Sequence, residues 1–247
     1  MTTLYETTTA HLPAQRSAAA PAPGTTHGEP PKLSSRTLAR TQRETLEAPR
    51  RRYSLAARFL FLTMDLLYGR KGTLRKYRVL EIVARVPYQA WETMSYKRIT
   101  RVHRDAGLAR RVWERVLEFR TQQDNEQWHL LIMTELVAAS GRREGFLRFR
   151  LMPRLIAFGY WHFCWVLYAV KPAWSHRLNA DFEDHAEHEY AEFVRDNPQL
   201  ETTPYSSVTC ADYGAFDSVA DLIRQISHDE RCHKRESEHH LLEPVVR

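Results

Sequence analysis

Two Glu-x-x-His pairs, each within an apolar row at helical spacing, constrain the fold of this 247-residue chain most strongly. Residues three apart lie on one face of a helix, so Glu126 and His129 can offer a carboxylate and an imidazole to one metal ion. Glu230 and His233 form an equivalent pair. An ionised carboxylate buried without a counter-charge costs several kcal/mol, so each acid requires a proton, an ion pair or a metal.

A third pair, Glu236 and His239, is excluded because His239 turns roughly 140° away from the apolar stripe at about 100° per residue. Two single acids also interrupt apolar faces. Glu81 lies on the face of a helix predicted over residues 73–104, interrupted near Pro87, and Glu183 lies on the face of a helix predicted over 173–196. The two pairs fall on helices predicted over residues 109–139 and 217–240.

The order single Glu, Glu-x-x-His, single Glu, Glu-x-x-His on four helices is typical of carboxylate-bridged di-iron and di-manganese bundles. Four carboxylates balance two divalent ions, and oxygen and imidazole ligands without thiolate favour iron or manganese over structural zinc. We therefore predict an all-α, ferritin-like four-helix bundle with additional helices and a carboxylate-bridged centre of two iron or two manganese ions. A bundle that holds the same groups as buried ion pairs remains the alternative.

Composition favours an anionic partner without choosing between nucleic acid and lipid, because 36 Lys and Arg against 30 Asp and Glu give a formal charge of +6. The three cysteines, Cys164, Cys210 and Cys232, are scattered, which argues against a disulfide framework. No Cys-x-x-Cys motif occurs, so a thiolate zinc site is not expected.

The chain divides into four predicted regions. Residues 1–45, rich in Thr, Ala, Pro and Ser, are predicted to be a disordered tail, either bacterial or an organelle transit peptide. Residues 46–70 are basic and aromatic, which suits a membrane interface as well as packing on the protein's own core. Residues 71–240 form the bundle, and 241–247 a tail. The apolar run 155–170 is too short to span a bilayer.

Within residues 65–240 the chain resembles the alternative oxidases, closest to the plastid terminal oxidase branch and its bacterial relatives. The matching motifs are DLLY (65–68), LEIVARVPY (80–88), NEQWHLLIM (125–133), EDHA (183–186) with Tyr190, and DERCH (229–233). The resemblance implies a non-haem di-iron quinol oxidase on one membrane leaflet, usually a homodimer, with two iron ions per chain. The implied metal ligands are Glu81, Glu126, His129, Glu183, Glu230 and His233.

Quinol and redox positions of the family match Leu80, Tyr168, Tyr190 and Asp229. Each also has an ordinary interpretation, because Leu80 and the tyrosines suit any core and Asp229 suits a solvated helix face. Tyr96 stands where plastid members carry a His, and Asp184 and His185 also depart from many mitochondrial members, which leaves the quinone undecided.

The expected reaction takes two quinols and dioxygen to two quinones and two waters, without moving protons across the membrane. The expected partners are ubiquinol or plastoquinol, dioxygen and membrane lipid, and not nucleic acid. The expected location is the cytoplasmic face of the inner membrane in a bacterium, or an organelle inner or thylakoid membrane. Two alternatives stay open: a di-iron quinone-ring hydroxylase or acyl desaturase, and a non-enzymatic helical module that binds anionic surfaces.

Overall fold

The computed structural model describes residues 30–141, 143–205 and 210–242, and every regular element in these ranges is helical. The elements are α1 (Ser35–Glu47), α2 (Leu55–Tyr68), α3 (Leu74–Ala84), α4 (Val86–Val102), α5 (Ala106–Ala139), the short π-helix Leu147–Leu151, α6 (Met152–Val170), α7 (Pro172–Asp196), the 3₁₀ turn Pro198–Glu201, α8 (Cys210–Tyr213) and α9 (Val219–Leu242). The predicted all-α fold is confirmed.

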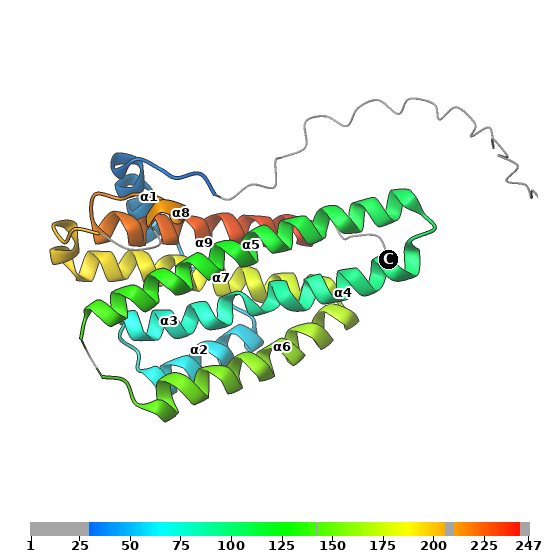
Figure 1. Ribbon diagram of the computed structural model, residues 1–247, viewed down its shortest axis with the longest axis horizontal. Helices are drawn as coiled ribbons and strands as arrows, with labels where there is room; N and C mark the ends of the chain where they lie inside the picture. Colours follow the sequence, from blue (N-terminus) through cyan, green and yellow to red (C-terminus); the bar gives the residue numbers. More distant parts are fainter. Residues whose placement is uncertain (1–29, 142, 206–209, 243–247) are drawn as a thin grey trace, which may run out of the picture.

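The bundle consists of four rods, formed by α3 with α4, by α5, by α7 and by α9 (Figure 1). Helix α7 packs along α9, and α5 packs along α3 and α4. Helices α2 and α6 cover one side of these rods, and α1 lies against α7 and α9 on the other. Each rod carries one part of the predicted ligand pattern, as expected for a ferritin-like bundle with additional helices.

Local sequence signals set the ends of the central helices. The Thr73 hydroxyl accepts a hydrogen bond from the Lys76 amide at the start of α3, and the Asp105 carboxylate caps α5 through the Leu108 amide. Pro87 lies in the first turn of α4, where its missing N–H is not needed, and α3 ends at Ala84. The interruption expected near Pro87 is therefore confirmed.

The prediction of disorder is wrong for residues 35–45, which belong to α1. Leu38 is buried, the Gln42 amide donates to the Ala191 carbonyl at 2.9 Å, and Arg224 Nε donates to Gln42 Oε1 at 2.7 Å. The buried face of α1 is mostly polar, so its sequence does not stand out as apolar, and hydrogen bonds to distant helices hold it in place. Residues 1–29 lie outside the described part of the chain.

The C-terminal boundary also shifts, because residues 241 and 242 complete α9, whereas 243–247 lie outside the described residues. The tail predicted over 241–247 therefore begins at least two residues later.

Helix α2 has one buried and one exposed apolar face. Leu60, Met64 and Tyr68 pack in the core, whereas Leu55 is 83%, Phe59 73% and Leu66 82% exposed. Helix α6 similarly leaves apolar side chains exposed at Leu155, Phe158, Phe163, Val166 and Val170. Within the described ranges, no helix has the length and apolar character that crossing a membrane requires.

Candidate metal centre

Six buried side chains from four helices converge in the middle of the bundle as two overlapping groups. One group is Glu81, Glu126, His129 and Glu230, and the other is Glu126, Glu183, Glu230 and His233. Within each group the ligand atoms all lie within 4.8 Å of one another. Glu126 and Glu230 belong to both groups, so each has the position of a carboxylate that bridges two ions.

The helical period produces this convergence directly. Glu126 and His129 are one turn apart on α5, and Glu230 and His233 are one turn apart on α9. Helices α3 and α7 bring Glu81 and Glu183 from the other rods. Neither Glu236 nor His239 joins either group, and His239 is exposed.

The polar atoms of this cluster fit a pair of bound cations. Buried polar atoms are normally hydrogen-bonded, with few exceptions. Here, nine polar atoms of the six side chains have no hydrogen-bond partner among the described residues. They are Glu81 Oε2, both oxygens of Glu126 and Glu230, Glu183 Oε2, His129 Nδ1 and both nitrogens of His233. His233 Nδ1 lies 2.7 Å from Glu126 Oε1 and His129 Nδ1 lies 3.1 Å from Glu230 Oε1. Lone pairs that face one another in this way suit cations placed between them.

The electrostatics of the protein alone lead to the same conclusion. Burial, with the charges of neighbouring carboxylates, raises the pKa of Glu81 and of Glu183 well above the ordinary value. Burial opposes ionisation of Glu126, but its contacts with His129 and His233 outweigh burial and lower its pKa. Burial opposes protonation of both histidines, but Tyr213 and the neighbouring acids outweigh it at His129, and Glu126 and Glu230 outweigh it at His233, so both pKa values are raised. Without metal the cluster holds protons, which cations would displace.

Asp229 fixes the orientation of His129. Its Oδ2 lies 3.3 Å from His129 Nε2 and accepts hydrogen bonds from the Tyr213 hydroxyl at 2.7 Å and from Asn125 Nδ2 at 3.2 Å. Gln225 Nε2 donates to the other oxygen at 2.7 Å. The Asp229 side chain is fully buried, so it is not a solvated helix acid. An acid that holds the outer nitrogen of a ligating imidazole sets its tautomer and increases its basicity.

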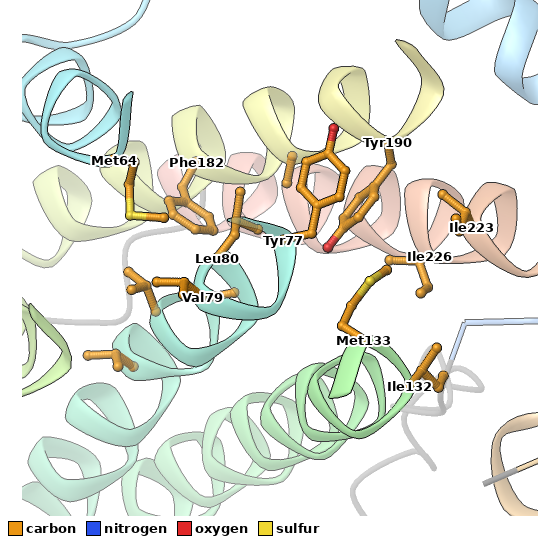
Figure 2. Close-up of a cluster of buried hydrophobic side chains, with 14 of the residues drawn as sticks. Met64, Tyr77, Val79, Leu80, Ile132, Met133, Phe182, Tyr190, Ile223 and Ile226 are labelled. Atoms are coloured by element: carbon orange, nitrogen blue, oxygen red, sulfur yellow. The ribbon is translucent and has the colours of Figure 1, made fainter. Parts of the chain in front are cut away.

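Two tyrosines bind the carboxylates of the single-acid helices. The Tyr88 hydroxyl donates to Glu183 Oε1 at 2.8 Å, and Asn179 Nδ2 donates to the same oxygen at 3.0 Å. The Tyr190 hydroxyl donates to Glu81 Oε1. Tyr190 extends from α7 toward the space between Tyr77 and Met133 (Figure 2).

The remaining predicted site residues occupy different surroundings. Leu80 is buried in the main core one residue before Glu81 (Figure 2). Tyr168 packs instead against Trp91 and Phe119 in a separate aromatic cluster, with its ring centroid 5.6 Å from that of His176. This cluster also contains Tyr88, whose ring lies 5.2 Å from that of Trp91 and whose hydroxyl donates to Glu183, so Tyr168 is linked to the acids through Trp91 and Tyr88.

Sequence reasoning did not identify Tyr213, Asn125, Tyr88 or Asn179 as supports of the cluster. Tyr213 lies in the short α8, which is too short to show a helical pattern of apolar residues. Asn179 is one of several polar residues on α7, and only its contacts with other helices mark it as a support of the cluster. Tyr88 ends the motif LEIVARVPY, but its hydrogen bond to Glu183 depends on the spacing between two rods.

Comparison with known proteins agrees with this geometry. The model of the family described as alternative oxidase matches residues 32–243. The chain is 27% identical over 182 residues to "Ubiquinol oxidase 2, mitochondrial" of Glycine max, covering 72% of this chain and 50% of that protein. It is 26% identical over 183 residues to the Arabidopsis thaliana protein of the same name, covering 72% and 48%. The chain spans about half the length of these curated relatives. With the family match extending over most of its length, the chain belongs to the alternative oxidase family.

Proposed function

We propose that this protein is a quinol oxidase that reduces dioxygen to water at a non-haem di-iron centre. The observation that carries the proposal is the sharing of Glu126 and Glu230 between two buried ligand groups, each completed by one further acid and one imidazole. The names of the two relatives, both ubiquinol oxidases, support the choice of quinol as reductant.

In this proposal Glu81 and His129 would hold one iron and Glu183 and His233 the other, while Glu126 and Glu230, which belong to both groups, would serve both ions. Four ionised carboxylates cancel the four positive charges of two ferrous ions, so the occupied centre is close to neutral in a dry interior. Two iron ions supply the reversible one-electron oxidation and the open coordination positions that reduction of dioxygen requires.

The chain's own residues orient ligands, exclude water and handle protons. Asp229 keeps His129 in the tautomer that presents Nδ1 to the cluster. The Tyr190 hydroxyl, on Glu81, is placed to donate a proton and an electron during turnover. Leu80, Ile132 and Met133 surround this region with apolar side chains, which keeps bulk water from the reacting groups.

An apolar cavity of about 340 Å³ between α2 and α6 suits the hydrocarbon part of a quinol. Phe59, Leu60 and Phe163 are among its lining residues, and Tyr160 forms part of the wall. Burial, Cys164 and the charge of Glu183 raise the pKa of Tyr160, so its hydroxyl stays protonated in this wall. Whether ubiquinol or plastoquinol is preferred is decided by comparing their rates of oxidation.

The proposed reaction is non-electrogenic. Two quinols release four electrons and four protons, and reduction of one dioxygen to two waters consumes the same number of each. Protons released and consumed on one leaflet carry no charge across the membrane. Vesicles containing the enzyme should therefore develop no membrane potential during oxygen uptake. We also propose a homodimer, supported by the family resemblance.

The proposed function predicts that purified protein contains two iron ions per chain and catalyses cyanide-resistant oxygen uptake with a soluble quinol. Metal analysis and an oxygen electrode measure both quantities. Hydroxylated quinone among the products would instead identify a ring hydroxylase, and full folding without bound iron would favour the bundle of buried ion pairs.

We further propose that the exposed faces of α2 and α6 insert into one leaflet. The exposed side chains of Phe59 on α2 and Phe163 on α6 both line the 340 Å³ cavity, so the apolar faces of the two helices meet there. Arg58, Arg148, Arg150 and Arg154 lie close to these faces in sequence, as expected for an interfacial helix near lipid headgroups.

The double variant Phe59→Asp with Leu66→Asp should bind neutral lipid vesicles at least about 100-fold more weakly than wild type. Burial of each large apolar side chain contributes about 1.5–3 kcal/mol, and charges oppose insertion. Leu117→Asp on α5, also an exposed apolar residue, is the control and should bind normally. Vesicle flotation measures binding, and release of wild type by high salt alone would show that electrostatics hold it there.

A further inference from the structure

A second cavity, of about 590 Å³, lies where α4, α5, the junction between α6 and α7, and the end of α9 meet. Four cationic side chains line it: Arg98, Arg101, Arg115 and Lys171. The described residues that form its lining include no carboxylate. Apolar side chains, among them Met94, Val102, Val112 and Val170, make up much of the rest. Its charge and shape suit an anion that carries an apolar part.

The inner wall of this cavity contains two buried histidines. His176 is only 4% exposed, lines the cavity, and its Nδ1 has no hydrogen-bond partner among the described residues. His240 is already engaged, since its Nε2 lies 2.8 Å from Glu118 Oε1. Glu118 also lies 3.6 Å from Arg115 and offsets part of that charge. His176 is thus a buried polar group placed to bond a ligand.

The first turn of α7 adds positive potential at the same place. Lys171, Pro172 and Ala173 line the cavity, and no side chain caps this 25-residue helix. The amino end of a helix carries about half a positive charge and favours anions. The cationic side chains and this helix end therefore favour an anion, and His176 Nδ1 offers a bound ligand a further polar partner.

We propose that the cavity binds the phosphate group of an anionic phospholipid whose acyl chains lie along the exposed face of α6. Val166 and Val170, the latter 71% exposed, belong to that face, and the neighbouring residues 168–171 line the cavity. Arg side chains bind phosphate oxygens in bidentate fashion. Exposed Trp174, with Lys171 Nζ 4.8 Å from its ring centroid, suits the headgroup level of a bilayer.

This lipid site rests on the proposed insertion of α2 and α6 but makes a separate claim about headgroup charge. A large cavity with apolar walls beside an apolar helix face favours a lipid over inorganic phosphate, which would contact only the polar part. The cavity residues do not belong to the six proposed ligands, so iron content should not depend on them.

The test compares flotation of iron-loaded full-length protein with vesicles of phosphatidylcholine alone and with added phosphatidylglycerol, at physiological salt. Phosphatidylglycerol should strengthen binding of wild type by about tenfold or more. Arg101→Gln with Lys171→Gln should lose most of this gain while binding neutral vesicles as wild type does. Arg104→Gln with Arg111→Gln removes the same charge near the same end of the molecule, outside the cavity lining, and should keep most of the gain.

Equal losses in the two double variants would overturn the proposal, because they would show general attraction to a charged surface. If wild type fails to bind neutral vesicles, the proposed apolar insertion of α2 and α6 is contradicted instead. The lipid site is then tested by comparing the two double variants on anionic vesicles. A third outcome would also overturn the proposal. If inorganic phosphate stabilises wild type against heat, and the cavity variant loses this effect but still binds vesicles as wild type does, the cavity binds a soluble anion. If the double variant fails to fold, Lys171→Gln alone is compared with Arg111→Gln.

Discussion

Glu126→Ala protein should retain little iron and lose quinol-dependent oxygen uptake by at least about 100-fold, since changes to residues that merely support metal ligands already cost 10–100-fold. Glu126 belongs to both ligand groups, so its removal takes one oxygen ligand from each proposed ion. His233→Ala should have a similar effect through the loss of one imidazole. Iron content per chain and oxygen uptake are measured on the same samples.

Glu118→Ala provides the matched control, because Glu118 is a buried acid on the same helix that contacts Arg115 and His240 rather than the cluster. Its loss should lower stability and leave iron content unchanged. Thermal unfolding adds a second readout: ferrous ions should stabilise wild type and Glu118→Ala, but stabilise Glu126→Ala much less. Full iron and full activity in either Glu126→Ala or His233→Ala would refute the ligand assignment.

Periodicity alone could place the six acids and imidazoles because helix geometry is local. Residues three apart on α5 or α9 must share a face whatever surrounds them, and an acid in an apolar row indicates a buried partner. The same argument separated Glu230 and His233 from Glu236 and His239, and the two groups found in the structure agree with it. The choice of iron and of quinol oxidation as the proposed reaction rests on the resemblance to alternative oxidases.

The parts that the sequence could not predict depend on contacts between distant segments. Helix α1 is held by Gln42 and by Arg231, which donates to Thr41, Thr45, Glu44 and Glu187. The composition of residues 35–47 alone therefore does not predict that this segment is ordered. The position of Asp229 along α9 does not by itself tell whether its side chain is solvated or buried. Only the approach of Tyr213 and Asn125 shows that it is enclosed and directed at His129.

The dual character of α2 has a similar cause. Its sequence suits both a packed helix and an interfacial one, and the structure uses one face for each purpose, with Met64 buried and Leu66 exposed. A pattern of apolar residues all round a helix does not determine which face meets the core.

Tyr190→Phe should leave iron content unchanged and reduce quinol-driven oxygen uptake by at least about tenfold, the scale of a proton-transfer contribution at its low end. Tyr190 is fully buried, and its hydroxyl donates to Glu81 Oε1. Substitution removes this hydroxyl alone, while the ring keeps its packing 4.8 Å from that of Tyr77.

The competing view is that the Tyr190 hydroxyl contributes only about 1 kcal/mol of stability, as an ordinary buried hydrogen bond does. Tyr77→Phe distinguishes the two, because the Tyr77 hydroxyl donates to the backbone carbonyl of Glu189 at 3.0 Å and touches no proposed ligand. Both variants should lose comparable thermal stability, but only Tyr190→Phe should lose kcat. Near-normal turnover of iron-loaded Tyr190→Phe would show that Tyr190 is only a core aromatic residue. Protons at Glu81 would then have to come from the quinol itself.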